Sequence, residues 1–115
     1  MNVLFHIDEP ERWPMVLANV GNMLAFYQGT AERPVIEIVA NGPAVAELKA
    51  SPSQGALHEP MRMLSEQSVD IAACRNALRS QGIAETELLP FVRTVPAGVV
   101  ELAVKQGEGY AYIKP

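Results

Sequence analysis

Residues 69–79 read VDIAACRNALR, and this stretch decides the fold. Its first part, Val69 to Ala73, is a short and mostly apolar run, which is typical of a strand buried on both faces. The following segment, Arg75 to Ser80, reads as a short helix, so the change from strand to helix falls at Cys74. Buried strands that alternate with helices build a parallel sheet covered on both faces.

Runs of the same kind lie on both sides of this stretch. Residues 3–7 and 35–40 are two clear strand candidates, and residues 91–95 and 110–113 are two weaker ones. Helical patterns lie between them. Short connections and right-handed crossovers then favour an α/β fold with a flavodoxin-like strand order or a simple relative of it.

The first helix is the best defined of the predicted helices. Asp8 and Glu11 stand three residues apart and suggest a capping box, and Gly29 suggests the end of the helix. Its apolar stripe has helical spacing and consists of Trp13, Leu17, Val20, Leu24 and Tyr27.

Shorter helical patterns follow the second and third strands. Asn41-Gly42-Pro43 opens a helical stretch over Ala44 to Lys49, and helical spacing resumes from Leu57. The segment between them, Ser51 to Gly55, is a mobile flap or a plain surface connection, and we favour the connection. The remaining helical patterns lie at residues 75–80, 85–89 and 96–106.

Composition excludes several classes of function. The 115 residues fit one domain, residues 1–115, and 49% of them are hydrophobic. A formal charge of −4 argues against a nucleic-acid partner. One cysteine and two distant histidines argue against a metal site, and we expect no cofactor. The N-terminus lacks the features of a secretory signal and no run is long enough to span a membrane, so we expect a cytoplasmic protein without membrane contact.

Ligands of open α/β sheets bind beyond the carboxyl ends of the strands. This rule selects polar positions that are far apart in the chain but share one edge of the sheet. They are His6, Asp8, Asn41, Cys74, Asn76, Thr94 and Pro96.

Cys74 is the main candidate for chemistry. A thiol at a helix N-terminus faces the positive end of the helix dipole, and Arg75 or Arg79 would add positive potential. Both effects favour the thiolate, which is the nucleophilic form. The alternative is that Cys74 packs as a small buried hydrophobic residue. The residues alone leave these two interpretations evenly balanced.

The other strand-end residues have structural interpretations that we favour. Asn41 is placed to bind a ligand or orient a thiol, but asparagine is more commonly an N-cap residue at such a position. Asp8 is also better explained as a helix cap. His6 is placed to take a proton from a thiol, although a structural histidine is the commoner case. Arg79, four residues after Arg75, is placed to receive an anion, and two solvated arginines are the plainer interpretation.

Four segments in this order resemble the DsrE/DsrF-like family. They are the start VLFHIDEP at residues 3–10, VANG at 39–42, ACRNAL at 73–78, and the C-terminal stretch from VPAGVVEL at 95–102 to GYAYIKP at 109–115. The resemblance covers essentially the whole chain and is closest to the small single-domain members. It implies a three-layer α/β/α sandwich with a mainly parallel five-stranded sheet.

The resemblance also implies a function. The best-understood members of the family carry a persulfide on a cysteine and pass the sulfur to a partner. That cysteine looks equivalent to Cys74, so the resemblance implies a sulfur-carrier or sulfurtransferase-like role. It further implies a homo-oligomer, a trimer or hexamer, with sulfur donor and acceptor proteins. Asn41, Asn76, Arg79 and His6 are the binding residues that we expect around Cys74. Two alternatives remain open: a non-enzymatic module that binds a small ligand or a protein, and an anion- or nucleotide-binding domain that uses helix N-termini.

Overall fold

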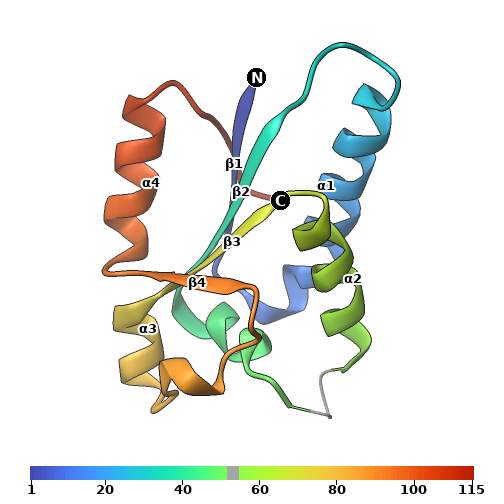
Figure 1. Cartoon of the computed structure of the whole chain (residues 1–115). Helices are drawn as coiled ribbons and strands as arrows, with labels where there is room; N and C mark the ends of the chain where they lie inside the picture. The colour runs from blue at the N-terminus through green and yellow to red at the C-terminus, as the bar shows by residue number, and fades with distance from the viewer. Residues whose placement is uncertain (52–54) are drawn as a thin grey trace.

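The order of elements in a computed structural model of the chain alternates between strands and helices (Figure 1). The structure describes residues 1–51 and 55–115. Its strands are β1 (Asn2–Ile7), β2 (Val35–Ala40), β3 (Asp70–Cys74), β4 (Val92–Val95) and β5 (Ala111–Ile113). Its α-helices are α1 (Trp13–Tyr27), α2 (Gly55–Glu66), α3 (Arg75–Ser80) and α4 (Gly98–Gly107), and its 3-10 helices are η1 (Pro10–Arg12), η2 (Gly42–Leu48) and η4 (Glu85–Glu87).

The five strands form one sheet in the order β4-β3-β2-β1-β5, and every neighbouring pair is parallel. This confirms the predicted α/β class with a five-stranded sheet, and the order is compatible with the flavodoxin-like arrangement or its simple relative. The parallel ladder aligns the carboxyl ends of β1, β2 and β3, so the residues that follow these strands gather at one edge. That edge lies at the lower end of Figure 1, beside η2 and α3.

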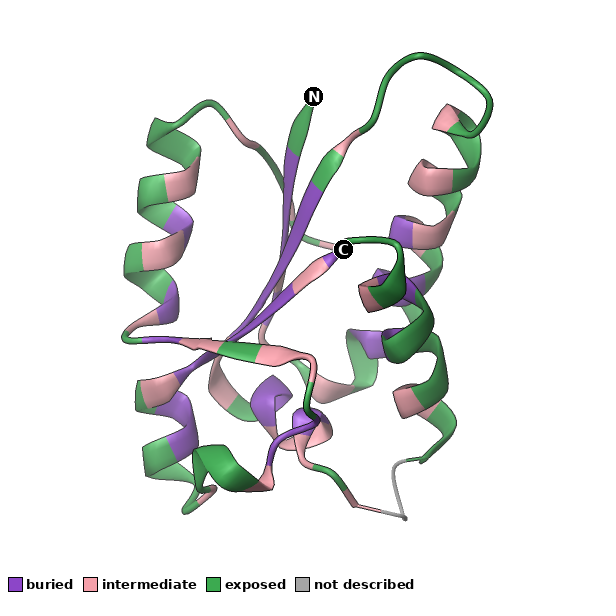
Figure 2. Ribbon diagram, in the orientation of Figure 1, coloured by how far each residue is buried: buried purple, intermediate pink, exposed green. Residues whose placement is uncertain are grey.

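Helices cover both faces of the sheet. In Figure 1, α1 and α2 lie to the right of the strands and α4 lies to the left. The larger part of the core lies under α1 and α2, where β1 contributes Val3, Phe5 and Ile7. Because side chains alternate along a strand, Leu4 and His6 face the α4 side, where Leu4 packs with Val39 and Leu102. The three central strands are accordingly buried along most of their length (Figure 2).

The first helix forms where its apolar stripe predicts it. Trp13, Leu17 and Val20 are buried against the sheet, and the Trp13 Nε1–H donates to the Ala44 carbonyl oxygen over 3.0 Å. This hydrogen bond joins the start of α1 to η2. Gly29 has a φ of 82°, a left-handed conformation that suits the residue after a helix, as predicted.

Three expectations about local structure were wrong or are untested. The stretch predicted as a helix at residues 44–49 is a 3-10 helix that starts at Gly42. Asp8 is not the N-cap residue of η1, which is Glu9, whereas Asn41 is the N-cap residue of η2 as expected, although its side chain makes no capping hydrogen bond. Of the segment predicted as a flap or a connection, residues 52–54 lie outside the described residues.

Candidate functional site

Cys74 lies at the carboxyl end of β3 and is the N-cap residue of α3. Its Sγ accepts a hydrogen bond from the Ala77 N–H over 3.4 Å, and the residue is 6% exposed. The first turn of a helix has N–H groups without intrahelical partners, and the sulfur satisfies one of them. The predicted position of Cys74 at a strand-to-helix junction is therefore correct, while its chemical role stays a prediction.

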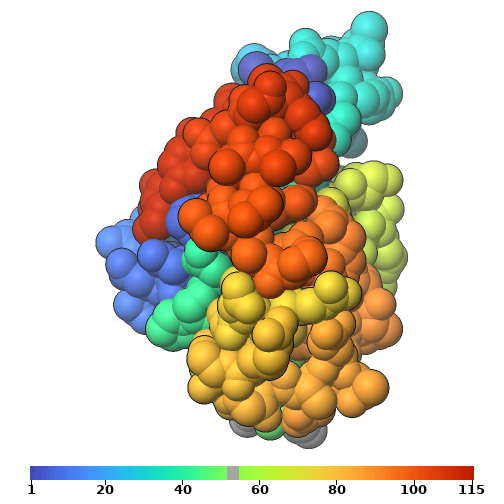
Figure 3. All heavy atoms as spheres, turned by 90° about the vertical axis from the view of Figure 1, so that its left-hand side faces the viewer, coloured from blue at the N-terminus to red at the C-terminus, as the bar shows by residue number. Residues whose placement is uncertain are grey.

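Asn41 and Gly98 lie beside Cys74. Register pairs Ala40 with Ala73, so Asn41 and Cys74 follow at the same level of the sheet. A Cβ placed on Gly98 would lie 3.0 Å from the Cβ of Asn41 and 3.3 Å from the Cβ of Cys74. The start of α4 is thus packed against both strand ends. Figure 3 shows the orange start of α4 beside the yellow α3.

His6 contacts Asn41 rather than a free thiol. Its Nε2 lies 3.0 Å from Asn41 Oδ1, and its Nδ1 lies 2.6 Å from the Tyr112 hydroxyl. Both ring nitrogens have partners, as expected for a structural histidine. The hydrogen bond also explains why the Asn41 side chain makes no capping hydrogen bond to η2: its oxygen already accepts from His6.

Asp8, at the same edge, forms an ion pair with Lys114 over 3.0 Å. This ion pair explains why Asp8 is not a cap. The hydrogen bond from Lys114 is the main cause of a lowered pKa for the Asp8 carboxyl. The contact ties the C-terminal segment to the end of β1 and favours the charged form of Asp8.

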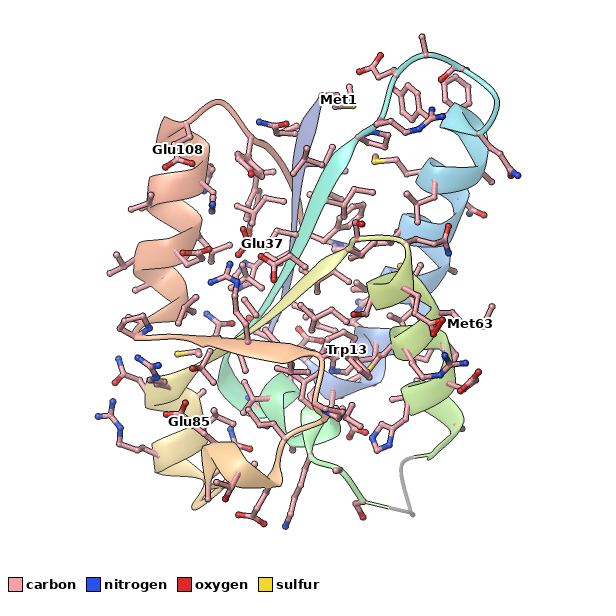
Figure 4. The ribbon with its side chains drawn as sticks, viewed as in Figure 1. Met1, Trp13, Glu37, Met63, Glu85 and Glu108 are labelled. Carbon is pink, nitrogen blue, oxygen red and sulfur yellow. The ribbon has the colours of Figure 1, made fainter. Side chains whose placement is uncertain are left out.

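The arginines after Cys74 contribute less positive potential than the sequence suggests. Arg75 forms an ion pair with Glu85 over 3.1 Å, and Glu85 also accepts from the Thr94 hydroxyl. In the side-chain view Glu85 lies near α3 (Figure 4). Arg79 is exposed and has no ion pair among residues 1–51 and 55–115, and Asn76 is exposed as well. The structure therefore brings together Cys74, Asn41 and His6 and leaves Asn76 and Arg79 at the surface of α3.

A second polar cluster, which the sequence analysis missed, lies under α4. Glu37 is 2% exposed, and its carboxylate lies 2.9 Å from Arg93 and 4.0 Å from Lys105. Arg93 also pairs with Asp70 and Glu101. Figure 4 shows Glu37 between the sheet and α4.

Burial, followed by the nearby Glu101 carboxyl, raises the pKa of Glu37 to about 8. The same contact lowers the pKa of Glu101. Because Glu37 comes from β2, Arg93 from β4 and Glu101 from α4, the cluster attaches α4 to the sheet. A single Glu inside the apolar run VIEIVA was the available signal, since an ionisable residue in a buried strand needs a partner.

The arrangement defines a class of protein: a parallel α/β sheet whose single cysteine starts a helix at the carboxyl edge, next to an asparagine and a second helix start. Within the described residues no helix has the length and apolar character needed to cross a membrane.

The DsrE/DsrF-like family model matches residues 14–115, and the chain belongs to this family. It is also similar to the solved structure of a protein of unknown function from Methanobacterium thermoautotrophicum. The two are 35% identical with a TM-score of 0.84, over 99% of this chain and 98% of that one. No curated protein matches the chain.

Proposed function

We propose that this protein is a sulfur carrier that accepts sulfane sulfur as a persulfide on Cys74. The observation that supports the proposal most is the hydrogen bond from the Ala77 N–H to Cys74 Sγ at the start of α3. A backbone donor aimed at sulfur, at the positive end of a helix, suits a sulfur that bears negative charge during transfer. Membership of a family associated with sulfur relay agrees with this chemistry.

The transfer that we propose exchanges one sulfur–sulfur bond for another. The Cys74 thiolate attacks the outer sulfur of a donor persulfide, and a new S–S bond forms as the donor's own S–S bond breaks. The donor leaves as a thiolate, and Cys74 keeps the transferred sulfur until an acceptor thiolate attacks it in the same way. No external oxidant or reductant is needed. A reducing compartment such as the cytoplasm suits this exchange, because it keeps the free thiol available.

The experiment is persulfide formation followed by intact-protein mass spectrometry. After incubation with a low-molecular-weight sulfane-sulfur donor, we expect a gain of one sulfur atom that is removed by a reductant. Cys74→Ser is the matched variant, because a serine oxygen accepts the cap hydrogen bond at least as well and preserves α3. If the wild-type protein gains no sulfur, or if Cys74→Ser gains as much, the proposed function is wrong.

The second candidate function is a binding module in which Cys74 only packs. The observation in its favour is that Cys74 is 6% exposed and belongs to the core cluster. In that case the thiol alkylates no faster than an ordinary buried cysteine, and Cys74→Ala leaves ligand binding and the mass of the assembly unchanged. The two candidates therefore differ in the reactivity of one thiol.

We also propose that the chain assembles into a homo-oligomer, a trimer or a hexamer. Apolar side chains on the outer side of α4 support this, because Val99 is 69% exposed and Val100 is 57% exposed. Exposed apolar residues that lie close together are typical of surfaces that contact another protein. Gly98 directly precedes them, so such an interface would border the Cys74 site.

A further inference from the structure

A chain of three hydrogen-bonded side chains crosses the sheet and ends beside Cys74. Tyr112 on β5 lies next to His6 on β1, and His6 lies next to Asn41 at the end of β2. The order β2-β1-β5 places the three residues side by side, since β1 pairs with both neighbours. Two strand pairings that are far apart in the sequence are therefore needed to form this chain.

The chemistry of the three groups sets the direction of each hydrogen bond. Asn41 Oδ1 is an acceptor, so the His6 Nε2–H donates to it over 3.0 Å. A neutral imidazole has one N–H, so Nδ1 accepts from the Tyr112 hydroxyl over 2.6 Å. The oxygen of the Asn41 amide is thereby held by His6, and its NH₂ group is turned to the other side.

That other side is the corner formed by Gly98 and Cys74. Asn41 Nδ2 lies 3.5 Å from the position that a Cβ on Gly98 would occupy, and the Cβ of Cys74 lies 3.3 Å from the same position. The Asn41 amide nitrogen and the Cys74 Cβ therefore both lie close to the same point of the α4 backbone.

We infer that Tyr112 and His6 are positioning residues that orient Asn41 so that its amide N–H donates to the sulfur on Cys74. The inference rests on the proposed function where it concerns a persulfide, and the same donor would also serve the unloaded thiolate. A persulfide carries its charge on the outer sulfur, one bond beyond the atom that Ala77 contacts. An anion in a largely buried place requires its own donor, and Asn41 supplies one.

The orientation of the Asn41 amide decides whether this side chain stabilises or destabilises a negative charge on the sulfur. With Nδ2 toward the sulfur, Asn41 donates to the anion and stabilises it. With the amide reversed, Oδ1 would face the anion, and two electron-rich atoms would repel each other. His6 prevents the reversal only while its Nε2 carries the proton, and the Tyr112 hydroxyl favours that tautomer by donating to Nδ1.

Tyr112→Phe removes the hydroxyl that favours this tautomer. In Tyr112→Phe a neutral His6 is free to carry its proton on Nδ1, so that Nε2 accepts from a reversed Asn41 amide. The NH₂ group of Asn41 then faces His6 and no longer faces the sulfur.

The test uses the full chain with matched variants. Asn41→Asp replaces the donor by an acceptor of the same shape, and Asn41→Ala removes the donor without adding charge. Asn22→Asp, at an exposed position of α1, is the control for added charge. Tyr112→Phe is compared with Tyr27→Phe, whose hydroxyl lies at the far end of α1 near Met1. Thermal unfolding establishes that each variant is folded.

Two rates are measured: alkylation of Cys74 by iodoacetamide without any sulfur donor, and decay of the Cys74 persulfide after the donor is removed. Loss of one hydrogen bond to a charged group changes a rate by about tenfold. We therefore expect Cys74 to be alkylated about tenfold more slowly in Asn41→Asp and Asn41→Ala than in wild type. We also expect the persulfide of these variants to decay about tenfold faster. We expect Tyr112→Phe to show part of this defect in the wild-type background and none in the Asn41→Ala background, because Tyr112 acts through Asn41. Both controls should match wild type.

The inference is overturned if folded Asn41→Asp and Asn41→Ala alkylate at the wild-type rate. It is also overturned if Tyr112→Phe slows alkylation as much in the Asn41→Ala background as in wild type, because a purely structural role would give that result. Alkylation requires no sulfur donor. If wild type takes up no sulfur while the alkylation rates change as expected, the proposed function fails and the positioning of Asn41 stands.

Discussion

Gly98, the first residue of α4, lies directly against Cys74. A Cβ at position 98 would come within 3.3 Å of the Cys74 Cβ and within 3.0 Å of the Asn41 Cβ. Carbon atoms pack best at about 3.5–4.0 Å, so a Cβ at this position would force its neighbours to move by a few tenths of an ångström. The missing side chain lets α4 begin at the carboxyl edge of the sheet, where a second helix N-terminus reaches the thiol.

The first prediction concerns this contact. Gly98→Ala should destabilise the protein by about 1–3 kcal/mol, because the added methyl group has to displace either α4 or the ends of β2 and β3. Moving α4 also uncovers the thiol, so Cys74 should react faster with iodoacetamide. Urea unfolding measures the first effect and the alkylation rate measures the second.

Gly21→Ala is the matched control for Gly98→Ala. Gly21 lies inside α1, and nothing would lie within 4 Å of a Cβ there. Alanine is a better helix former than glycine, so this variant should be more stable by about 0.5–1 kcal/mol. If Gly98→Ala is stabilised like Gly21→Ala, with unchanged thiol reactivity, the close packing of α4 on Cys74 is contradicted.

The second prediction is a pH dependence of stability that arises from Glu37. Its pKa is raised from 4.5 to about 8 in the folded protein, so between these values the folded state holds a proton that the unfolded state has released. Stability due to this group is therefore full at low pH and is lost as the pH rises toward 8. The lowered pKa of Glu101 and that of Asp8 act in the opposite sense, but only in the acid range below their ordinary values.

Glu37→Gln tests this dependence, because glutamine keeps the shape and does not ionise. Between about pH 5 and about pH 8 the free energy of unfolding of wild type should fall by on the order of 1–3 kcal/mol relative to the variant. Urea unfolding at several pH values measures the difference. Glu47→Gln, on η2 and outside the cluster, is the control and should follow the wild-type curve. If the free energy of unfolding depends on pH in the same way in wild type and Glu37→Gln, the raised pKa of Glu37 is not the cause of the pH dependence.

The fold was predictable because the strands are short apolar runs with helical patterns between them. Val35 to Ala40 and Val69 to Ala73 mark their strands without any knowledge of tertiary structure, and the parallel arrangement follows from that alternation. Local propensity was a weaker guide at residues 44–49, where the chain forms a 3-10 helix from Gly42. Tertiary contacts such as the hydrogen bond from Trp13 to Ala44 hold that short segment in place.

The site was predictable only in part. The rule for strand ends places Cys74, Asn41 and His6 at one edge, because it depends on topology alone. The contacts among them depend on register and on close approach, which is why Tyr112 and Gly98 were missed. The capping hydrogen bonds expected from Asp8 and Asn41 do not form for the same reason, since Lys114 and His6 are distant in sequence and contact those side chains instead.

The third prediction concerns the exposed valines of α4. Val100 is 57% exposed and lies one residue from Val99, which is 69% exposed. If this side of α4 is the interface of the proposed homo-oligomer, Val100→Glu buries an unpaired charge in each contact and should shift the protein to monomers. The fold should be kept, because the side chain already faces solvent in the single chain. Sedimentation equilibrium measures the mass of the assembly.

Met63→Glu is the matched control for Val100→Glu. Met63 is 54% exposed on α2, on the opposite face of the sheet, so it receives the same charge outside the proposed interface. We expect Met63→Glu to keep the wild-type mass while Val100→Glu loses it, because burying an unpaired carboxylate costs several kcal/mol, whereas a solvated one costs little. A monomeric wild type would contradict the proposed assembly. If Val100→Glu instead keeps the wild-type mass, the interface of the oligomer does not include this side of α4 and does not border the Cys74 site.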